Sequence, residues 1–513
     1  MKSLFLSLML YVFTVLPLAA QNAPGSIRLN QLGYFPEAPK VAIIVSDGTL
    51  VKFNILKTEK SETVFTGSLS AQRPAELSDK ITQIADFSSL KETGSFVLEV
   101  PGLGVSYPFE IKPKVYEALV KAAAKSYYFQ RASYPMNEKF AGKWKRPAGH
   151  PDTKVRVHAS ATTKQRPEGT FISAPKGWYD AGDYNKYIVN SGITMGTLMS
   201  VYEDFPGYIK KLKLDIPESK NKLPDLLDEV LWNLRWMQAM QDPHDGGVYH
   251  KLTNPNFDDL AVWPHEATED RYVVKKTTAA ALNFAAVMAQ AGRIFRDYNN
   301  INPGLADSCI IAAEKAWDWA KKNPKVLYLQ EEMNLDHSPK ITTGAYGDDN
   351  LQDEFIWAAI ELYVTTKKDS YYKLLDFFQE RNLQVPSWNQ VRALGYYTLV
   401  RHEKQLSPIA KQGMGEAKRQ IVNLADDLTK NVFFRSYQTV MGSSVQHYIW
   451  GSNAVAANQG IALIQAFKIT SNKEYLAHAL GNLDYLLGRN ATGYSFVTGF
   501  GNKTPKNPHH RPS

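Results

Sequence analysis

The sequence predicts a multidomain β + α fold, in which a small all-β sandwich precedes a large helical toroid. Residues 21–112 carry short runs of β-branched residues separated by Gly, Pro, Asp and Ser. From residue 113 to residue 513, apolar residues recur at helical spacing, and long aromatic and glycine-rich stretches join the helical segments. The 513 residues, of which 44% are hydrophobic and 21% charged, suffice for two or three domains with a substantial core.

Residues 1–20 have the three parts of a cleavable secretory signal peptide. Lys2 precedes an apolar run over residues 4–16, and small residues follow before Gln21. A membrane anchor is the alternative, but the run is short and no stop-transfer charges follow it. The single cysteine, Cys309, lies in an apolar helical segment, so no cysteine for lipid attachment follows the leader. We therefore expect a secreted or periplasmic protein without a membrane span.

Charge and composition narrow the class of partner. The formal net charge of +8 is a mild excess for this length, and it includes no long basic run, which argues against nucleic acid. Aromatic residues are frequent, with 27 Tyr, 23 Phe and 10 Trp, which permits a carbohydrate-binding cleft without requiring one. We expect the protein to be a monomer.

Six segments of the first domain alternate or cluster β-branched and aromatic residues, with turn residues between them, which is typical of a β-sandwich. These segments are 27–36, 40–46, 50–56, 62–69, 81–88 and 94–100. Neither an acid pair nor a cluster of metal ligands stands out among them. We therefore expect this domain to pack against the next one.

Eleven segments of the second domain place apolar residues at positions i, i+3, i+4 and i+7, which predicts helices. They are 114–130, 187–201, 223–241, 277–298, 305–322, 351–366, 369–380, 388–401, 416–430, 453–468 and 472–489. A run of this kind predicts an α/α toroid, in which inner and outer helices alternate and loops at one end form the cleft.

The string GWYDAGDYNKY, residues 177–187, contains two carboxylates three residues apart, Asp180 and Asp183. In a turn both can lie on one side, where they repel each other unless water, a metal ion or a helix N-terminus lies between them. Trp178 and Tyr184 flank the pair, as expected of a cleft in which rings stack on sugars and acids act on the glycosidic oxygen. The alternatives are that Asp183 caps the following helix and that the aromatic residues fill the core.

The whole string resembles the DAGD segment of glycoside hydrolase family 9, the inverting cellulases and their relatives. The resemblance implies that Asp183 is the catalytic base and that Asp180 helps to hold the attacking water. Residues 242–252, 277–294 and 450–459 also resemble family 9 segments, which implies an (α/α)6 barrel of twelve helices. The opening residues 27–36 resemble the immunoglobulin-like domain that often precedes family 9 catalytic domains.

Residues 495–511, SFVTGFGNKTPKNPHHR, fit the histidine signature of that family. The resemblance implies that His509 contacts substrate and that Arg511 donates to sugar hydroxyls or supports the catalytic acid. A proline-rich loop that fixes an imidazole beside a forked guanidinium suits both roles. A structural segment or a disordered basic tail is the alternative.

The acidic segment 348–354, DDNLQDE, begins a predicted helix. A solvated acidic helix start is one interpretation, because acidic side chains stabilise a helix N-terminus. The segment also resembles a calcium site of some family members, with Asp349, Asp353 and Glu354 as ligands. Where those members have a further Asp ligand after a tryptophan, this chain has Asn389. The chemistry itself needs no cofactor, so any Ca²⁺ would be structural.

Inverting hydrolysis needs a general acid as well as a base. The family takes its acid from a Glu downstream of the histidine signature, near the last helix, and this sequence ends at Ser513. We therefore expect a barrel without its last helix and with little activity as it stands. The favoured hypothesis is a secreted inverting endo-β-1,4-glucanase that acts on cellulose or related β-glucans. The alternatives are a preference for xyloglucan or cello-oligosaccharides, and a catalytically silent glycan-binding protein.

Overall fold

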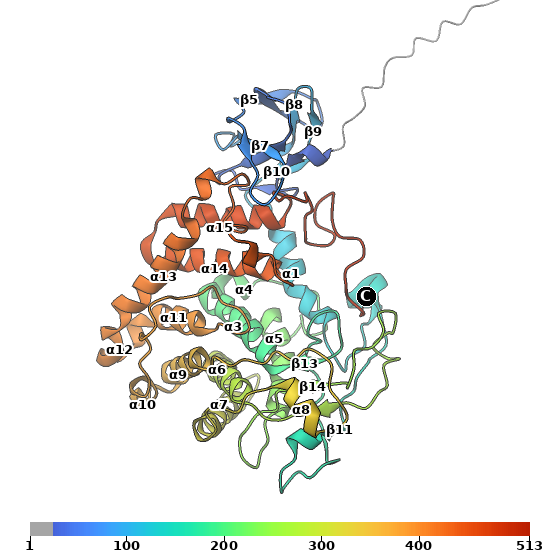
Figure 1. The fold of residues 1–513 in the computed structure, drawn as a ribbon, viewed down its shortest axis with the longest axis vertical. Helices are drawn as coiled ribbons and strands as arrows, with labels where there is room; N and C mark the ends of the chain where they lie inside the picture. Colours follow the sequence, from blue (N-terminus) through green and yellow to red (C-terminus); the bar gives the residue numbers. More distant parts are fainter. Residues whose placement is uncertain (1–23, 513) are drawn as a thin grey trace, which may run out of the picture.

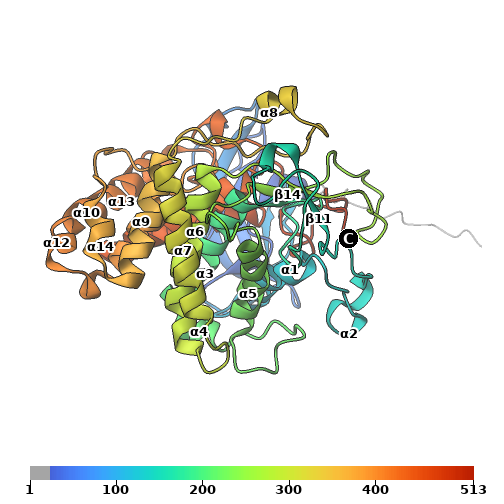
Figure 2. The same ribbon diagram turned by 90° about the horizontal axis from the view of Figure 1, so that it is seen from below.

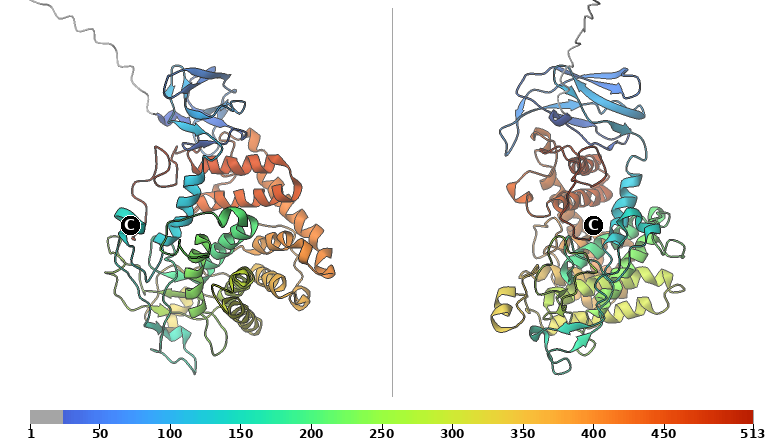
Figure 3. Two further views of the ribbon diagram at one scale, coloured as in Figure 1. Left: turned by 180° about the vertical axis from the view of Figure 1, so that it is seen from behind. Right: turned by 90° about the vertical axis from the view of Figure 1, so that its right-hand side faces the viewer.

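The computed structural model describes residues 24–512, so the leader predicted over residues 1–20 lies outside the described part. A β-sandwich lies against one end of a helical domain, directly over the helices nearest the C-terminus (Figures 1 and 3). The last strand of the sandwich ends at Ile111 and the first helix begins at Glu117. The predicted order of a β-sandwich followed by a helical domain is confirmed.

The N-terminal domain consists of two sheets. The first has the strand order β1 (Ile27–Arg28), β3 (Val41–Val45), β7 (Ile81–Asp86) and β6 (Arg73–Pro74). The second has the order β2 (Gly33–Tyr34), β10 (Phe109–Ile111), β8 (Gly94–Val100), β4 (Lys52–Lys57) and β5 (Thr63–Ser68), and β9 (Gly104–Val105) pairs with β8. Phe96, Leu98 and Val100 alternate inward along β8, as the period of two requires. Each of the six predicted segments contains a strand.

Ten helices of the second domain have ten or more residues within the described part of the chain. They are α1 (Glu117–Phe129), α3 (Ile188–Asp204), α5 (Asp225–Ala239), α6 (Thr278–Phe295), α7 (Leu305–Lys322), α9 (Gln352–Thr366), α11 (Arg392–Arg401), α13 (Met414–Thr429), α14 (Asn453–Thr470) and α15 (Lys473–Leu486). Shorter helices are α2 (Glu138–Ala141), α4 (Pro206–Ile209), α8 (Gln330–Asp336), α10 (Asp369–Lys373) and α12 (Pro408–Gln412). The arrangement is consistent with an (α/α)6 barrel.

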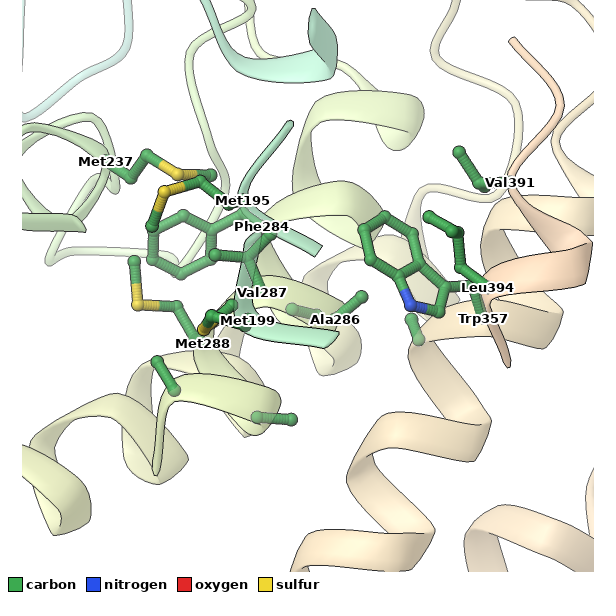
Figure 4. Packing of buried hydrophobic residues seen from close by; sticks show 14 of the residues in the cluster. Met195, Met199, Met237, Phe284, Ala286, Val287, Met288, Trp357, Val391 and Leu394 are labelled. Atoms are coloured by element: carbon green, nitrogen blue, oxygen red, sulfur yellow. The ribbon is translucent and has the colours of Figure 1, made fainter. Parts of the chain in front are cut away.

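Helix α6 lies at the centre of this domain, in contact with α3, α7 and α9 (Figure 2). All but one of its residues are buried, which explains why it is apolar on every side. Met195, Met199, Met237 and Met288 surround Phe284 on one side of the core (Figure 4). Flexible methionine side chains fill such irregular spaces between helices.

Two predicted helices are shorter than expected. The segment 369–380 is helical only over α10, because Asp376 accepts the N–H of Phe378 and closes a local turn that competes with the helix. The segment 388–401 becomes helical only at Arg392. Before it, Ser387 and Gln390 exchange backbone hydrogen bonds, and the N–H of Val391 donates to Asp353.

A small sheet within the helical domain was not predicted. Its order is β12 (Phe171–Ile172), β11 (Val155–Val157), β15 (Tyr272–Val273), β14 (Lys251–Thr253) and β13 (Lys186–Tyr187). Strands of two or three residues are too short to show a period of two in the sequence. The sheet matters for function because β13 forms the end of the acid-pair string and β14 pairs with it.

Buried hydrogen bonds join the two domains. Asn30 Nδ2 donates to Asp484 Oδ1 on α15 at 2.8 Å and to the hydroxyl of Tyr116 at 2.9 Å. The side chain of the next residue, Gln31, donates to the carbonyl of Gly493 at 2.9 Å. The sandwich therefore packs on the helical domain through satisfied polar groups. Among residues 24–512, none of the helices is both long and apolar enough to cross a membrane.

We predict that Asn30→Ala destabilises the whole molecule by about 1–3 kcal/mol, because the fully buried Asp484 loses a hydrogen bond that no water replaces. Calorimetric or urea unfolding measures the loss. Asn54→Ala is the matched control, since Asn54 bonds Glu99 at a half-exposed position in the same domain. Equal effects of the two substitutions would contradict the importance of the interface.

Candidate active site

The acid pair lies in the turn that leads into β13 and α3. The N–H of Asp180 donates to the carbonyl of Asn185 at 3.0 Å and closes this turn. Asp183 Oδ2 accepts the side-chain amide of Asn185 at 2.7 Å and the hydroxyl of Tyr187 at 3.1 Å. The N-cap of α3 is Tyr187, so the alternative in which Asp183 caps that helix is wrong. Within residues 24–512, Asp183 Oδ1 has no hydrogen-bond partner, which leaves it available to a water molecule.

Neutral donors also hold Asp180. Asn190 Nδ2 donates to its Oδ1 and the hydroxyl of Tyr346 donates to its Oδ2, both at 2.8 Å. Burial, together with the nearby charge of Asp183, raises the pKa of Asp180 to about 7. Near neutral pH Asp180 can therefore keep a proton.

A polar cavity of about 220 Å³ opens beside Asp180. Its lining includes Gln130, Tyr187, Asn190 and Thr194. A space of this size with several polar partners can hold ordered water. This agrees with the role expected of Asp180, which is to hold a water molecule next to the base.

The histidine segment lies directly against the acid-pair turn, although more than 300 residues separate the two in the sequence. At Gly182 an added Cβ would lie 2.1 Å from the carbonyl oxygen of His509, so only glycine permits this approach. The imidazole of His509 is exposed, and its centre lies 6.3 Å from that of Trp450. The structure thus brings His509 to the acid pair, as the resemblance implied.

Arg511 clamps the same two segments together. Its Nη1 donates to the carbonyl of Gly182 at 2.9 Å and its Nε donates to the carbonyl of Asp258 at 2.8 Å. Its own N–H also donates to Gly182 at 3.2 Å. These bonds occupy two of the three guanidinium nitrogens and give Arg511 a structural role, while Nη2 is left for the predicted donation to sugar hydroxyls or support of the acid.

The rings of Trp178 and Tyr184 are buried, although Trp178 also lines the cavity beside Asp180. Trp178 packs on Tyr127 with the ring centres 4.8 Å apart. Tyr184 is fully buried, and its hydroxyl donates to the carbonyl of Val262 at 2.6 Å. The alternative, in which the aromatic residues of this string fill the core, holds for both.

Several residues at the site were missed by sequence analysis. Asn185 and Tyr187 lie inside the acid-pair string and Asn190 follows one turn later, so their positions alone could have suggested them. Tyr346 carries no local signal, because it comes from a loop 163 residues beyond Asp183. Trp450 is the most exposed large apolar residue in the described part of the chain, at 90%, and is a platform on which a sugar could stack.

Buried ion pairs fix the strand after the acid pair. Lys186 Nζ lies 2.7 Å from Asp152 Oδ2, and Arg271 Nε lies 3.2 Å from Asp152 Oδ1. Arg271 also donates to the carbonyl of Tyr184 at 2.9 Å. Lys186 and Arg271 therefore bind Asp152 and the backbone. The carboxylates of the acid pair accept hydrogen bonds from neutral groups instead.

The acidic segment at the start of α9 is buried, which contradicts a solvated helix start. The carboxylates of Asp348, Asp353 and Glu354 lie together, whereas the side chain of Asp349 is exposed and lies apart from them. Burial and mutual repulsion raise the pKa of Asp353 to about 6 and that of Glu354 well above its usual range. Two of the predicted ligands, Asp353 and Glu354, thus lie beside Asp348, while Asp349 is exposed next to them in the sequence.

Four buried oxygens of these three acids have no hydrogen-bond partner, and they are the atoms that a cation would satisfy. Even so, within residues 24–512 no group of three or more His, Cys, Asp or Glu side chains is arranged to hold a metal ion as it stands. These three acids therefore supply the oxygen ligands that a calcium site needs, but their side chains are not arranged around an ion. Asn389, which stands where some relatives have an Asp ligand, accepts a bond from Ser387.

Comparisons with known proteins agree with this geometry. The profile of glycosyl hydrolase family 9 matches residues 116–513, and that of the cellulase N-terminal ig-like domain matches residues 22–105. The chain is 43% identical to the xyloglucan-specific endo-β-1,4-glucanase BoGH9A of Bacteroides ovatus, over 95% of this chain and 82% of that protein. It is 32% identical to endoglucanase D of Acetivibrio thermocellus, over 95% of this chain and 75% of that protein.

Solved structures show the same likeness. A Bacteroides ovatus GH9 structure, 43% identical, superposes with a TM-score of 0.92 and covers 96% of this chain and 89% of its own. A structure of AaCel9A in complex with cellobiose-like isofagomine, 26% identical, superposes with a TM-score of 0.82 over 95% of this chain and 87% of its own.

Proposed function

The chain belongs to glycosyl hydrolase family 9 as a glycoside hydrolase of the endo-β-1,4-glucanase type, and we propose that it cleaves xyloglucan with inversion at the anomeric carbon. The observation that carries the mechanism is the difference between the two carboxylates. Asp183 has one oxygen that accepts hydrogen bonds and one that has no partner, and the neighbouring Asp180 has a pKa of about 7. The xyloglucan preference is supported by the 43% identity to an enzyme specific for that polymer.

In the proposed reaction, water lies between Asp180 and Asp183. Asp183 Oδ1 accepts a proton from this water, whose oxygen attacks the anomeric carbon from the side opposite the leaving group. The glycosidic C–O bond breaks, and the leaving oxygen takes a proton from a second carboxylic acid. We assign no residue among 24–512 to that second role. In this reaction His509 and Trp450 would contact the sugar next to the cleavage point, a role supported by the approach of His509 to Gly182 and to Trp450.

We predict that Asp183→Asn lowers kcat by about 100- to 10,000-fold, because the attacking water loses its base. The substrate is 2,4-dinitrophenyl β-cellobioside, whose leaving group departs without protonation, so the assay isolates the base. Oligosaccharide affinity should be unchanged in a calorimetric titration. Asp259→Asn, an exposed acid on a neighbouring loop, is the control and should keep full activity.

Two outcomes would contradict the assignment of the base. One is retention of activity by Asp183→Asn. The other is a product that appears first as the β-anomer in a proton NMR time course, since attack by a base-activated water from the opposite face must yield the α-anomer.

The polymer preference is tested by initial rates on xyloglucan, cellulose and mixed-linkage glucan. We expect the highest kcat/KM on xyloglucan. A higher value on cellulose would overturn the preference while leaving the enzyme class intact. Inertness on all three polymers, together with measurable affinity for cello-oligosaccharides, would instead favour the silent glycan-binding protein.

We further propose that the protein is secreted, which is supported by the leader-like residues 1–20.

We also propose a structural Ca²⁺ at the start of α9. Asp348, Asp353 and Glu354 would hold the ion, and its charge would remove the repulsion among three buried carboxylates. The ion takes no part in bond cleavage. It would order the loop that leads from Tyr346 to α9 and so support the donor to Asp180.

We predict that CaCl₂ raises the melting temperature and that a chelator lowers it, because a ligand that binds only the folded state stabilises it by about 2.7 kcal/mol at a hundred times its Kd. Differential scanning fluorimetry measures the shift. Glu354→Gln should remove the dependence on calcium, and Asp349→Asn, whose side chain is exposed, should retain it. A melting temperature indifferent to both additives would exclude the site.

A further inference from the structure

Lys251 on β14 is a fully buried cation without a carboxylate in contact. Its Nζ donates to the carbonyl of Gly344 at 2.7 Å, to Gln330 Oε1 at 2.8 Å and to Thr343 Oγ1 at 3.0 Å, all of which are neutral acceptors. By contrast, buried Lys186 lies 2.7 Å from Asp152. A buried charge is costly unless something nearby favours it, so the surroundings of Lys251 need an explanation.

The charge that acts on Lys251 is that of Asp183, the proposed base. Asp183 is the ionised group that favours the protonated lysine, while burial lowers the pKa of Lys251 to about 7. Between them lies Tyr187, whose ring centre is 5.6 Å from Nζ and whose hydroxyl donates to Asp183 at 3.1 Å. Lysine, phenol and carboxylate thus form one polarised row.

The other groups around Lys251 bring no competing charge. The ring of Tyr328 lies 5.2 Å from Nζ and stacks on His250. Burial lowers the pKa of His250 to about 3, so this imidazole is neutral where the enzyme works. Asp180, whose pKa is about 7, is the remaining titratable carboxyl next to the row.

Lys251 also secures the loop that carries the second phenol. The backbone at Gly344 lies so close to Tyr187 that an added Cβ would be 3.3 Å from its hydroxyl. Two residues later, the hydroxyl of Tyr346 donates to Asp180, and its ring meets that of Tyr187 at 4.8 Å. The bonds from Lys251 to Thr343 and Gly344 therefore hold the two phenol donors of the acid pair, Tyr187 and Tyr346, in position.

We propose that Lys251 is a positioning residue of the acid pair: its ammonium group holds the loop 343–346 against Tyr187, so that the hydroxyls of Tyr187 and Tyr346 stay on Asp183 and Asp180. The inference rests on the proposed function, because it assigns Lys251 a part in the same reaction. It adds a determinant of the pH at which the acid pair becomes active.

The test is the pH dependence of kcat/KM for Lys251→Met on 2,4-dinitrophenyl β-cellobioside. Without the ammonium group the loop loosens and Asp180 loses the hydroxyl of Tyr346, which favours a protonated acid pair, so the acidic limb should move up by about 1 pH unit, a loss of about 10-fold at acidic pH that shrinks as the pH rises. KM should stay unchanged. Lys251→Gln, whose amide can still donate, serves where the Met variant fails to fold, and its acidic limb should move in the same way.

Lys40→Met is the matched control. Lys40 is also a buried lysine whose Nζ donates to backbone carbonyls, but it lies in the sandwich, far from the acid pair in the sequence, and its loss should not move the profile. A loss for Lys251→Met that is equal at every pH, or an unmoved profile, would overturn the proposal. If Asp183→Asn is inactive while Lys251→Met keeps the wild-type pH profile, only the proposal for Lys251 fails. If Asp183→Asn keeps full activity, the assignment of Asp183 as the base fails.

Discussion

The structure depends on holding two buried carboxylates together within one turn. Asp180 and Asp183 repel each other and both lose hydration, yet each accepts bonds from an amide and a phenol rather than from a cation. This choice has a chemical reason. An arginine in contact would stabilise the carboxylate and weaken it as a base, whereas neutral donors hold its orientation without neutralising it. The nearby Arg271 is accordingly turned to Asp152.

A second constraint comes from the distant histidine segment. It reaches the acid pair only because Gly182 has no side chain, and its path toward that point is fixed by the sandwich. Gln31 donates its N–H to the carbonyl of Leu487, and its Oε1 accepts the N–H groups of Asn502 and Lys503. The N-terminal domain thus anchors the histidine segment six residues before His509, in agreement with the packing role expected of it.

Sequence analysis predicted those features of the fold and the site that depend on interactions between residues close together in the chain. Apolar periodicity located the helices because most of them bury one face, and the acid-pair string carried its own donors within a few residues. The remainder depends on contacts between distant segments. Tyr346 and Lys251 acquire their roles only when β14 and the loop 343–346 meet β13. The burial of Tyr184 depends on the loop at Val262, and the burial of Asp348 beside an exposed Asp349 depends on how this segment packs in the folded chain.

The distribution of buried charge separates structural positions from functional ones. Arg131 binds Glu229 at 2.7 Å and Arg293 binds Glu361 at 2.8 Å, so these buried ions satisfy each other and serve packing. Near the acid pair Lys186 and Arg271 likewise bind Asp152, but other buried charges lack an ionic partner in contact: the acid pair has neutral donors, Lys251 has neutral acceptors, and Glu354 has two orphaned oxygens. Asp228 on α5, bonded only through Asn221, shows that an unpaired carboxyl alone is not diagnostic. What distinguishes the cleft is that several unpaired groups converge there, and such convergence persists only where a substrate, a water or an ion completes it.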